Sequence, residues 1–166
     1  MDDPFAVLGL PRAWNVTVEE IRAAQRTSSI AAHPDRQTDP AARANALQLS
    51  SRINAAATEL LDALSRGAAI VRVLAPTPRP PEPKQDATFL MRMMELREAV
   101  DQASDNALAR SAVAAQIAHE LRAIEIETDV AMRELITRPK VGTWSAAVDA
   151  LNRLRALRRA HEESAR

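Results

Sequence analysis

Residues 17–40 read TVEEIRAAQRTSSIAAHPDRQTDP, and the helix signals in this stretch decide the first half of the fold. Thr17 and Glu20 have the spacing of a capping box, in which each side chain accepts a hydrogen bond from the other residue's backbone amide. We therefore expect a helix from about Val18. The helix must stop at His33, because the residue before a proline is pushed out of the helical region of backbone conformations.

A second helix is predicted after the loop. The pair Asp39-Pro40 supplies an N-cap side chain and a first-turn proline, and Gly67 is the expected stop signal. One face of this helix carries the apolar residues Ile53, Ala56 and Leu60. The stretch and its continuation thus predict two long antiparallel helices joined by a loop.

The composition favours the same class of structure throughout. Alanine, leucine, arginine and glutamate dominate, whereas aromatic residues make up 2% of the chain and only 3 residues are glycine. The abundant residues are strong helix formers rather than the β-branched and aromatic residues that favour strands. We therefore expect an all-α fold.

A proline-rich segment divides the chain. Residues 76–83 read PTPRPPEP, and their five prolines remove backbone donors and prevent helix formation, leaving a stiff extended connector. We therefore expect a first domain over residues 1–75, a linker over residues 76–85 and a second domain over residues 86–166.

Three helices are predicted in the second domain, at about residues 86–103, 105–136 and 143–161. Their starts and stops are supplied by Asp105, Thr143 and the pair Arg138-Pro139. The apolar residues that recur at helical spacing in the last two helices are Val113, Ile117, Leu121, Ile124, Leu135, Trp144, Ala147, Leu151 and Leu154. A small antiparallel three-helix bundle fits this pattern.

Charge and composition exclude several classes of function. Lys plus Arg is 22 and Asp plus Glu is 22, so the net charge is +0 and no excess positive charge is available to hold a nucleic acid. The absence of cysteine excludes disulfides and thiolate metal sites, and His119 and His161 lack the spacing of metal ligands. No glycine-rich phosphate loop or catalytic triad pattern is present either. We therefore expect neither a metal, a cofactor nor an enzymatic activity.

The sequence shows neither a signal peptide nor a membrane-spanning segment. The first ten residues, MDDPFAVLGL, lack the basic start and the apolar core of a signal peptide. No segment of the chain approaches the roughly 20 apolar residues that cross a bilayer. We expect a cytoplasmic protein with no membrane partner.

The predicted loop contains the tripeptide His33-Pro34-Asp35, whose chemistry suits contact with another protein. His33 lies at a helix C-terminus, where its ring can meet free carbonyls, and Pro34 stiffens the turn. Asp35 is a loop carboxylate that can pair with an arginine of a partner.

Together with its surroundings, this tripeptide resembles the HPD loop of a J domain. The opening DPFAVLGL at residues 3–10 and INAA at residues 53–56 are also similar to J domains, and the resemblance covers about residues 3–70. It implies a helical hairpin whose HPD loop enters a DnaK-type chaperone and promotes ATP hydrolysis. It also implies a basic face on the second helix, which Arg22 and Arg26 would supply, with Arg36 just after the loop. This sequence departs from many J domains at Thr27, Ala31 and Ala32, where a base or a tyrosine is common.

The segment FLMRMMELREAVD at residues 89–101 has two apolar faces when it is drawn as a helix. One face, expected to be core, carries Phe89, Met93, Leu96 and Val100. The opposite face carries Leu90, Met91, Met94 and Glu98. A bundle of three helices has no obvious place to bury a second face, so this face predicts a contact surface, with an enclosed helix or packing against the first domain as the alternatives.

This segment and Thr143-Trp144-Ser145-Ala146-Ala147 resemble the C-terminal scaffold-binding domain of HscB-type co-chaperones of iron–sulfur cluster assembly. The resemblance implies an L-shaped molecule of two helical domains with two partners, a DnaK/HscA-type ATPase and an IscU-type scaffold. The residues that would contact the scaffold are Leu90, Met91, Met94, Glu95 and Glu98. Gln102 in place of an acid and Ala156 in place of a bulky aromatic residue are departures, which imply a smaller contact or a different client.

Three other interpretations remain open at this point. The nearest is a J-domain co-chaperone of the same build that serves another small client protein. A structural helical adaptor with an inert HPD loop is the second. An enzyme that uses His33 and Asp35 as an acid–base pair is the least favoured, because no third catalytic group or cofactor motif accompanies them.

Overall fold

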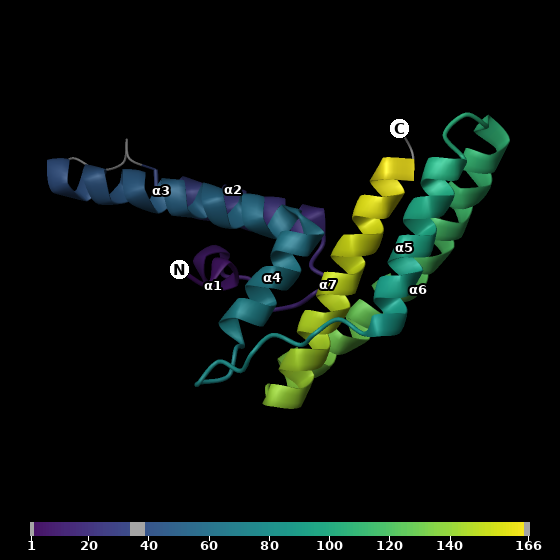
Figure 1. Ribbon diagram of the computed structural model, residues 1–166. Helices are drawn as coiled ribbons and strands as arrows, with labels where there is room; N and C mark the ends of the chain where they lie inside the picture. Colours follow the sequence, from purple (N-terminus) through teal and green to yellow (C-terminus); the bar gives the residue numbers. More distant parts are fainter. Residues whose placement is uncertain (1, 34–38, 165–166) are drawn as a thin grey trace. The chain divides into compact units, whose positions relative to one another are not determined.

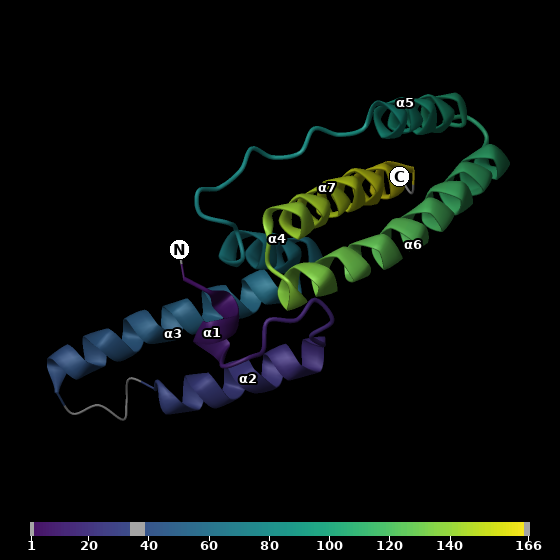
Figure 2. The ribbon, with the colours of Figure 1, turned by 90° about the horizontal axis from the view of Figure 1, so that it is seen from below.

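The computed structural model describes residues 2–33 and 39–164, and within these residues all regular structure is helical (Figures 1 and 2). The all-α prediction is therefore confirmed. The chain divides into two compact units, Met1–Val73 and Leu74–Arg166. Across the described ranges, no helix combines the length and the apolar character needed to cross a membrane.

The first unit begins with the short helix α1, Pro4–Leu8. The Asp3 carboxylate accepts a hydrogen bond from the Phe5 amide at 3.0 Å, which caps the helix start. Gly9 ends it with a φ of 66°, a left-handed conformation that favours glycine. Both ends of α1 are thus fixed by residues adjacent to it in the chain.

Helix α2, Val18–Ala31, begins with the capping box that the sequence predicts. The Thr17 hydroxyl accepts a hydrogen bond from the Glu20 amide at 3.2 Å, and the Thr17 amide donates to the Glu20 carboxylate at 2.7 Å. These two bonds satisfy amides that would otherwise lack a helical partner. The helix ends at Ala31, slightly before the predicted stop at His33.

Helix α3, Pro40–Leu61, runs antiparallel to α2, and the two lie side by side (Figure 2). The apolar residues predicted for its buried face are all buried. They form one core with Phe5 of α1 and Ile21 of α2, both fully buried. The predicted helical hairpin is thus present and is closed on one side by α1.

Helix α4, Ala63–Val73, was not predicted. Asp62 adopts an extended conformation that breaks the helical run after Leu61, and its carboxylate accepts a hydrogen bond from the Ser65 amide at 2.7 Å. Gly67 is a buried residue inside this new helix and does not terminate α3. The expected stop at Gly67 was therefore wrong, because the break is made by the cap at Asp62.

The second unit contains three helices, α5 at Ala87–Gln102, α6 at Ala107–Thr137 and α7 at Val141–Ser164. Short connections make each helix antiparallel to the one before it (Figure 2). Helix α6 begins at Ala107, two residues later than expected, because the cap is Asn106, whose side chain accepts hydrogen bonds from two amides of the first turn. The predicted three-helix bundle is confirmed.

Helix α7 supplies most of the core of this unit. The predicted residues Trp144, Ala147, Leu151 and Leu154 are all buried, as are Ile117, Ile124 and Leu135 of α6. The helix begins at Val141, two residues before the predicted start, and the Thr143 hydroxyl donates to the Arg138 carbonyl at 2.7 Å. Predicted α6 core residues Val113 and Leu121 are only partly buried.

Candidate functional site

In the sequence, the HPD tripeptide falls between α2 and α3. Pro34 and Asp35, and also Arg36, lie outside the described residues. His33 is described and follows the C-terminal end of α2, where its side chain is exposed. The structure therefore places only one member of the predicted chaperone-binding loop.

The predicted basic face on α2 is present on the surface. Arg22 and Arg26 are both exposed, and their spacing of four residues puts them on the same side of the helix. Within the described residues, neither guanidinium is paired with a carboxylate. The two arginines are thus placed to meet a negatively charged partner.

The second predicted surface is on α5. Leu90, Met91 and Met94 are 50%, 63% and 64% exposed, and Glu95 and Glu98 are exposed beside them. We call these five residues the outer face of α5. Three large apolar side chains are thus exposed on one face of this helix.

The opposite side of α5 is less buried than the sequence predicts. Leu96 is 1% exposed, but Phe89, Met93 and Val100 are only partly buried. The expectation of a four-residue core stripe was therefore wrong for three of its members. Helical periodicity gives the direction of a side chain, but burial also requires a neighbouring side chain long enough to meet it.

The side chains of α7 that face α5 are too short to bury Phe89, Met93 and Val100. Ala156 and Ala160 face α5, and between the two helices lies a groove of about 1210 Å³. The α5 residues that line it are Gln85 at the helix entrance, Phe89, Leu90, Met93, Met94, Arg97, Val100 and Asp101. Leu90 and Met94 belong both to the groove and to the outer face, so the two surfaces are continuous.

The charges around this groove are unevenly paired. Arg159 and Glu163 of α7 form an ion pair at 3.2 Å. Arg97 of α5 and Arg155 of α7 line the groove as well, and within the described residues neither is paired with a carboxylate. Arg155 instead donates a hydrogen bond to the amide oxygen of Asn152. The groove thus combines an apolar floor with Arg97 and Arg155, which make no ion pair within the described residues, and with the carboxylate of Asp101.

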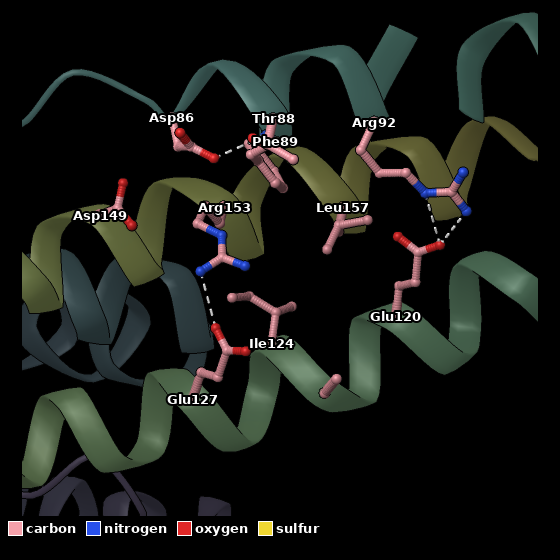
Figure 3. Close-up of a pocket in the computed structure, with 11 residues that line it drawn as sticks. Asp86, Thr88, Phe89, Arg92, Glu120, Ile124, Glu127, Asp149, Arg153 and Leu157 are labelled. Atoms are coloured by element: carbon pink, nitrogen blue, oxygen red, sulfur yellow. Dashed lines mark hydrogen bonds and ion pairs between the residues drawn. The ribbon is translucent and has the colours of Figure 1, made fainter. Parts of the chain in front are cut away.

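A second, smaller pocket of about 380 Å³ lies where α5, α6 and α7 meet (Figure 3). Arg92 of α5 donates to Glu120 of α6 at 3.1 Å and 2.5 Å, and Arg153 of α7 donates to Glu127 of α6 at 2.9 Å. The other two carboxylates are also engaged. Asp86 caps α5, and Asp149 accepts from the side chain of Gln85 at 3.1 Å.

The charged groups of this pocket are thus engaged within the unit, and the contact of Arg92 with Glu120 attaches α5 to α6. The hydrogen bond to Glu120, followed by that to Glu95, raises the pKa of Arg92. The guanidinium of Arg153 also lies over the Phe89 ring, 5.3 Å from its centroid. These contacts were not predicted, because each joins residues far apart in the sequence.

Metal binding finds no support in the described part of the chain. Residues 2–33 and 39–164 contain no group of three or more histidine, cysteine, aspartate or glutamate side chains that could hold an ion. His119 is exposed on α6, and His161 is partly buried in α7.

Comparison with known proteins agrees with this description. Residues 85–163 match the model of the HSCB C-terminal oligomerisation domain. The chain is 29% identical over 133 residues to the co-chaperone protein HscB homolog of Chromobacterium violaceum, which covers 78% of this chain and 76% of that protein. It is 33% identical over 109 residues to the HscB homolog of Bordetella petrii, or 64% of each chain.

Two solved structures share the fold over nearly the whole chain. The chaperone HscB from Vibrio cholerae superposes with a TM-score of 0.69 at 24% identity, covering 99% of this chain and 96% of that one. The human co-chaperone protein HscB superposes with a TM-score of 0.77 at 18% identity, covering 99% and 81%. At these identities the likeness establishes a shared fold.

Proposed function

Because this chain belongs to the HscB-type co-chaperones, we propose that it binds an IscU-type iron–sulfur scaffold protein and delivers it to a DnaK/HscA-type ATPase. The scaffold would bind the outer face of α5. The ATPase would bind the HPD loop, His33-Pro34-Asp35, together with Arg22, Arg26 and Arg36. Stimulation of ATP hydrolysis would follow from that second contact.

The observation that carries the proposal is the exposure of Leu90, Met91 and Met94 on a helix of the matched domain. Burying one such side chain at an interface contributes roughly 1.5–3 kcal/mol. Methionine side chains also adapt to irregular partner surfaces. Leu90, Met91 and Met94 would therefore supply a large part of the apolar contact that the proposal requires.

The proposed contact with the ATPase depends on charge. Arg22 and Arg26 are exposed on one side of α2, and such a face would steer an acidic partner surface toward the adjoining loop. Asp35 would then pair with an arginine of the ATPase through a charge-assisted hydrogen bond. The chain itself needs no catalytic group in this mechanism.

Joining both contacts in one chain gives the proposed coupling. A scaffold held on α5 is kept at a raised effective concentration near the ATPase that the HPD loop engages. Loop binding favours the state of the ATPase that hydrolyses ATP, because only that state makes the contact fully. Delivery and hydrolysis would thus occur together.

Calorimetric titration of the full chain with an IscU-type scaffold tests the client side of the proposal. Met91→Ala and Met94→Ala should each weaken binding by about tenfold or more, if the side chain is largely buried on binding. Leu108→Ala is the matched control, because Leu108 is an 82% exposed apolar residue of α6, outside the outer face. Equal affinities for all of these variants would place the client elsewhere on the molecule.

A pull-down from a lysate separates this proposal from its nearest rival. Recovery of a DnaK-type ATPase together with an IscU-type scaffold supports the iron–sulfur function. Recovery of the ATPase with a different small protein would instead identify a J-domain co-chaperone of another client.

A further inference from the structure

We propose that the proline-rich segment before α5 is a strap of the second unit, in which the side chains of Arg79 and Gln85 bind α7 and position the start of α5. The second unit begins at Leu74, so this segment, residues 76–85, belongs to it. We call residues 76–85 the strap. Attachment of the strap does not depend on the proposed function, whereas its effect on client affinity rests on the scaffold binding the outer face of α5.

Arg79 is the first anchor of the strap. Its guanidinium lies over the Trp144 ring, 5.6 Å from the ring centroid, which is within the range of a cation–π contact. The Glu82 carboxylate accepts a hydrogen bond from this guanidinium at 3.1 Å and helps to keep it in place. Trp144 is fully buried and lies at the beginning of α7. One point of the strap is thus fixed against the first turns of α7.

Gln85 is the second anchor. Its side-chain amide donates a hydrogen bond to the Asp149 carboxylate of α7 at 3.1 Å. Asp149 follows Trp144 by five residues, which is roughly 7.5 Å along the helix axis. Gln85 also directly precedes Asp86, whose carboxylate accepts a hydrogen bond from the Phe89 amide and caps α5. The second anchor therefore holds the chain one residue before the cap of α5.

Side chains must supply these anchors because the strap is rich in proline. Its five prolines lack the backbone N–H group, so the strap cannot bond to a helix through a regular set of backbone hydrogen bonds. Prolines also restrict the conformations of the free segment, so little conformational entropy is lost when the strap binds α7. A few side-chain contacts can therefore hold it, and the loss of one of them should release it.

The strap matters for α5 because this helix has little core of its own. Leu96 is the one buried residue of α5, which is described in full, and it lies in the second half of the helix. Leu90 and Met91 of the outer face lie in the first half, so their position depends on how the start of the helix is held. Arg79 lies outside the outer face and acts through the start of α5. It is thus a positioning residue.

Fluorescence of Trp144 tests the first anchor directly. Trp14→Phe leaves Trp144 as the one tryptophan of the sequence. In that background, Arg79→Ala should raise the acrylamide quenching constant about twofold or more, because the ring loses its cover. Arg79→Lys keeps a cation beside the ring and should stay closer to the parent protein. Lys84→Ala is the matched control, because Lys84 is an exposed cation of the strap that neither pairs with a carboxylate nor lies over a ring within the described residues.

Hydrogen exchange followed by mass spectrometry tests the effect on α5. In the otherwise unchanged full chain, Arg79→Ala and Gln85→Ala should each speed exchange in the first half of α5 by about threefold or more, while exchange in α6 stays the same. Lys84→Ala should exchange like wild type. Circular dichroism should show that every variant keeps its helices.

Calorimetric titration with an IscU-type scaffold connects the strap to client binding. Arg79→Ala should weaken binding about threefold to tenfold, because part of the binding free energy is then used to fix α5. Arg79→Lys should recover most of this loss. Arg79→Met, which keeps an apolar stem without the cation, should not.

The three measurements separate the strap from the proposed function. Unchanged quenching and unchanged α5 exchange in Arg79→Ala, or equal changes in Lys84→Ala, would overturn the attachment of the strap. Faster α5 exchange with wild-type scaffold affinity would overturn its positioning role while the proposed function stands. If wild type does not bind the scaffold, the proposed function falls, and quenching and exchange still decide whether the strap is attached. Increased quenching and exchange together with weaker scaffold binding would support both the attachment and the positioning role.

Discussion

Helices α5 and α7 pack against each other in the second unit but are held by different kinds of contact. Helix α7 has eight buried residues, including Trp144 and Leu154, whereas in α5, which is described in full, Leu96 is the one buried residue. Helix α5 is held instead by Arg92 and Glu120, by Arg153 over Phe89, and by its capped start. Because most large apolar residues of α5 are exposed or only partly buried, polar contacts attach this helix to the rest of the unit.

The largest loss of stability is expected from a substitution in the core of α7. Leu154→Ala removes a fully buried side chain, and the cavity it leaves should lower the free energy of unfolding by about 2–5 kcal/mol. Urea unfolding followed by circular dichroism measures this change. A cost below about 1 kcal/mol would show that α7 is not the principal core helix.

Hydrogen exchange compares the two helices within the same molecule. Because α5 buries little and lies at the edge of the unit, its amides should open with a free energy at least about 1 kcal/mol below those of α7. Exchange followed by mass spectrometry provides the measurement. Equal protection of α5 and α7 would contradict the division into a core helix and an attached helix.

A smaller effect is expected at Met93. This residue was predicted to be core, but it lines the groove and is partly buried, so Met93→Ala should cost about 1 kcal/mol rather than a full core penalty. Leu96→Ala, three residues away and buried, is the control and should cost at least twice as much. Similar costs for the two variants in urea unfolding would mean that the groove closes around Met93.

The smallest stability effect is expected at the ion pair between α5 and α6. Arg92→Met keeps an unbranched stem but removes the charged guanidinium, and because both partners are partly exposed the loss should stay below about 1 kcal/mol. The exchange of α5 amides should nevertheless increase, while that of α7 amides should not. Unchanged exchange in α5 would show that the pair does not attach this helix.

The fold could be predicted where its causes are local. The capping box of Thr17 and Glu20 depends on residues adjacent in the chain and was predicted correctly. The break at Asp62 was missed because Gly67 offered a more familiar stop signal, yet a short carboxylate that caps the next helix acts earlier in the chain.

The site could be predicted only in part, for a related reason. The helical period correctly placed Met91 and Met94 on the exposed face of α5 and Leu96 on the buried face, because the direction of a side chain is set by its own helix. The groove depends on Ala156 and Ala160, more than fifty residues away in the sequence, and on their being too short to reach α5. Nothing in residues 89–101 alone contains that information.

Steady-state ATP hydrolysis tests whether this one chain joins a client to an ATPase. A DnaK-type ATPase is assayed with an IscU-type scaffold and wild type, Asp35→Asn or Met91→Ala of this chain. Wild type should stimulate hydrolysis, Asp35→Asn should reduce stimulation to near background, and Met91→Ala should retain basal stimulation but lose the increment due to the scaffold. Full stimulation by Asp35→Asn would contradict the account.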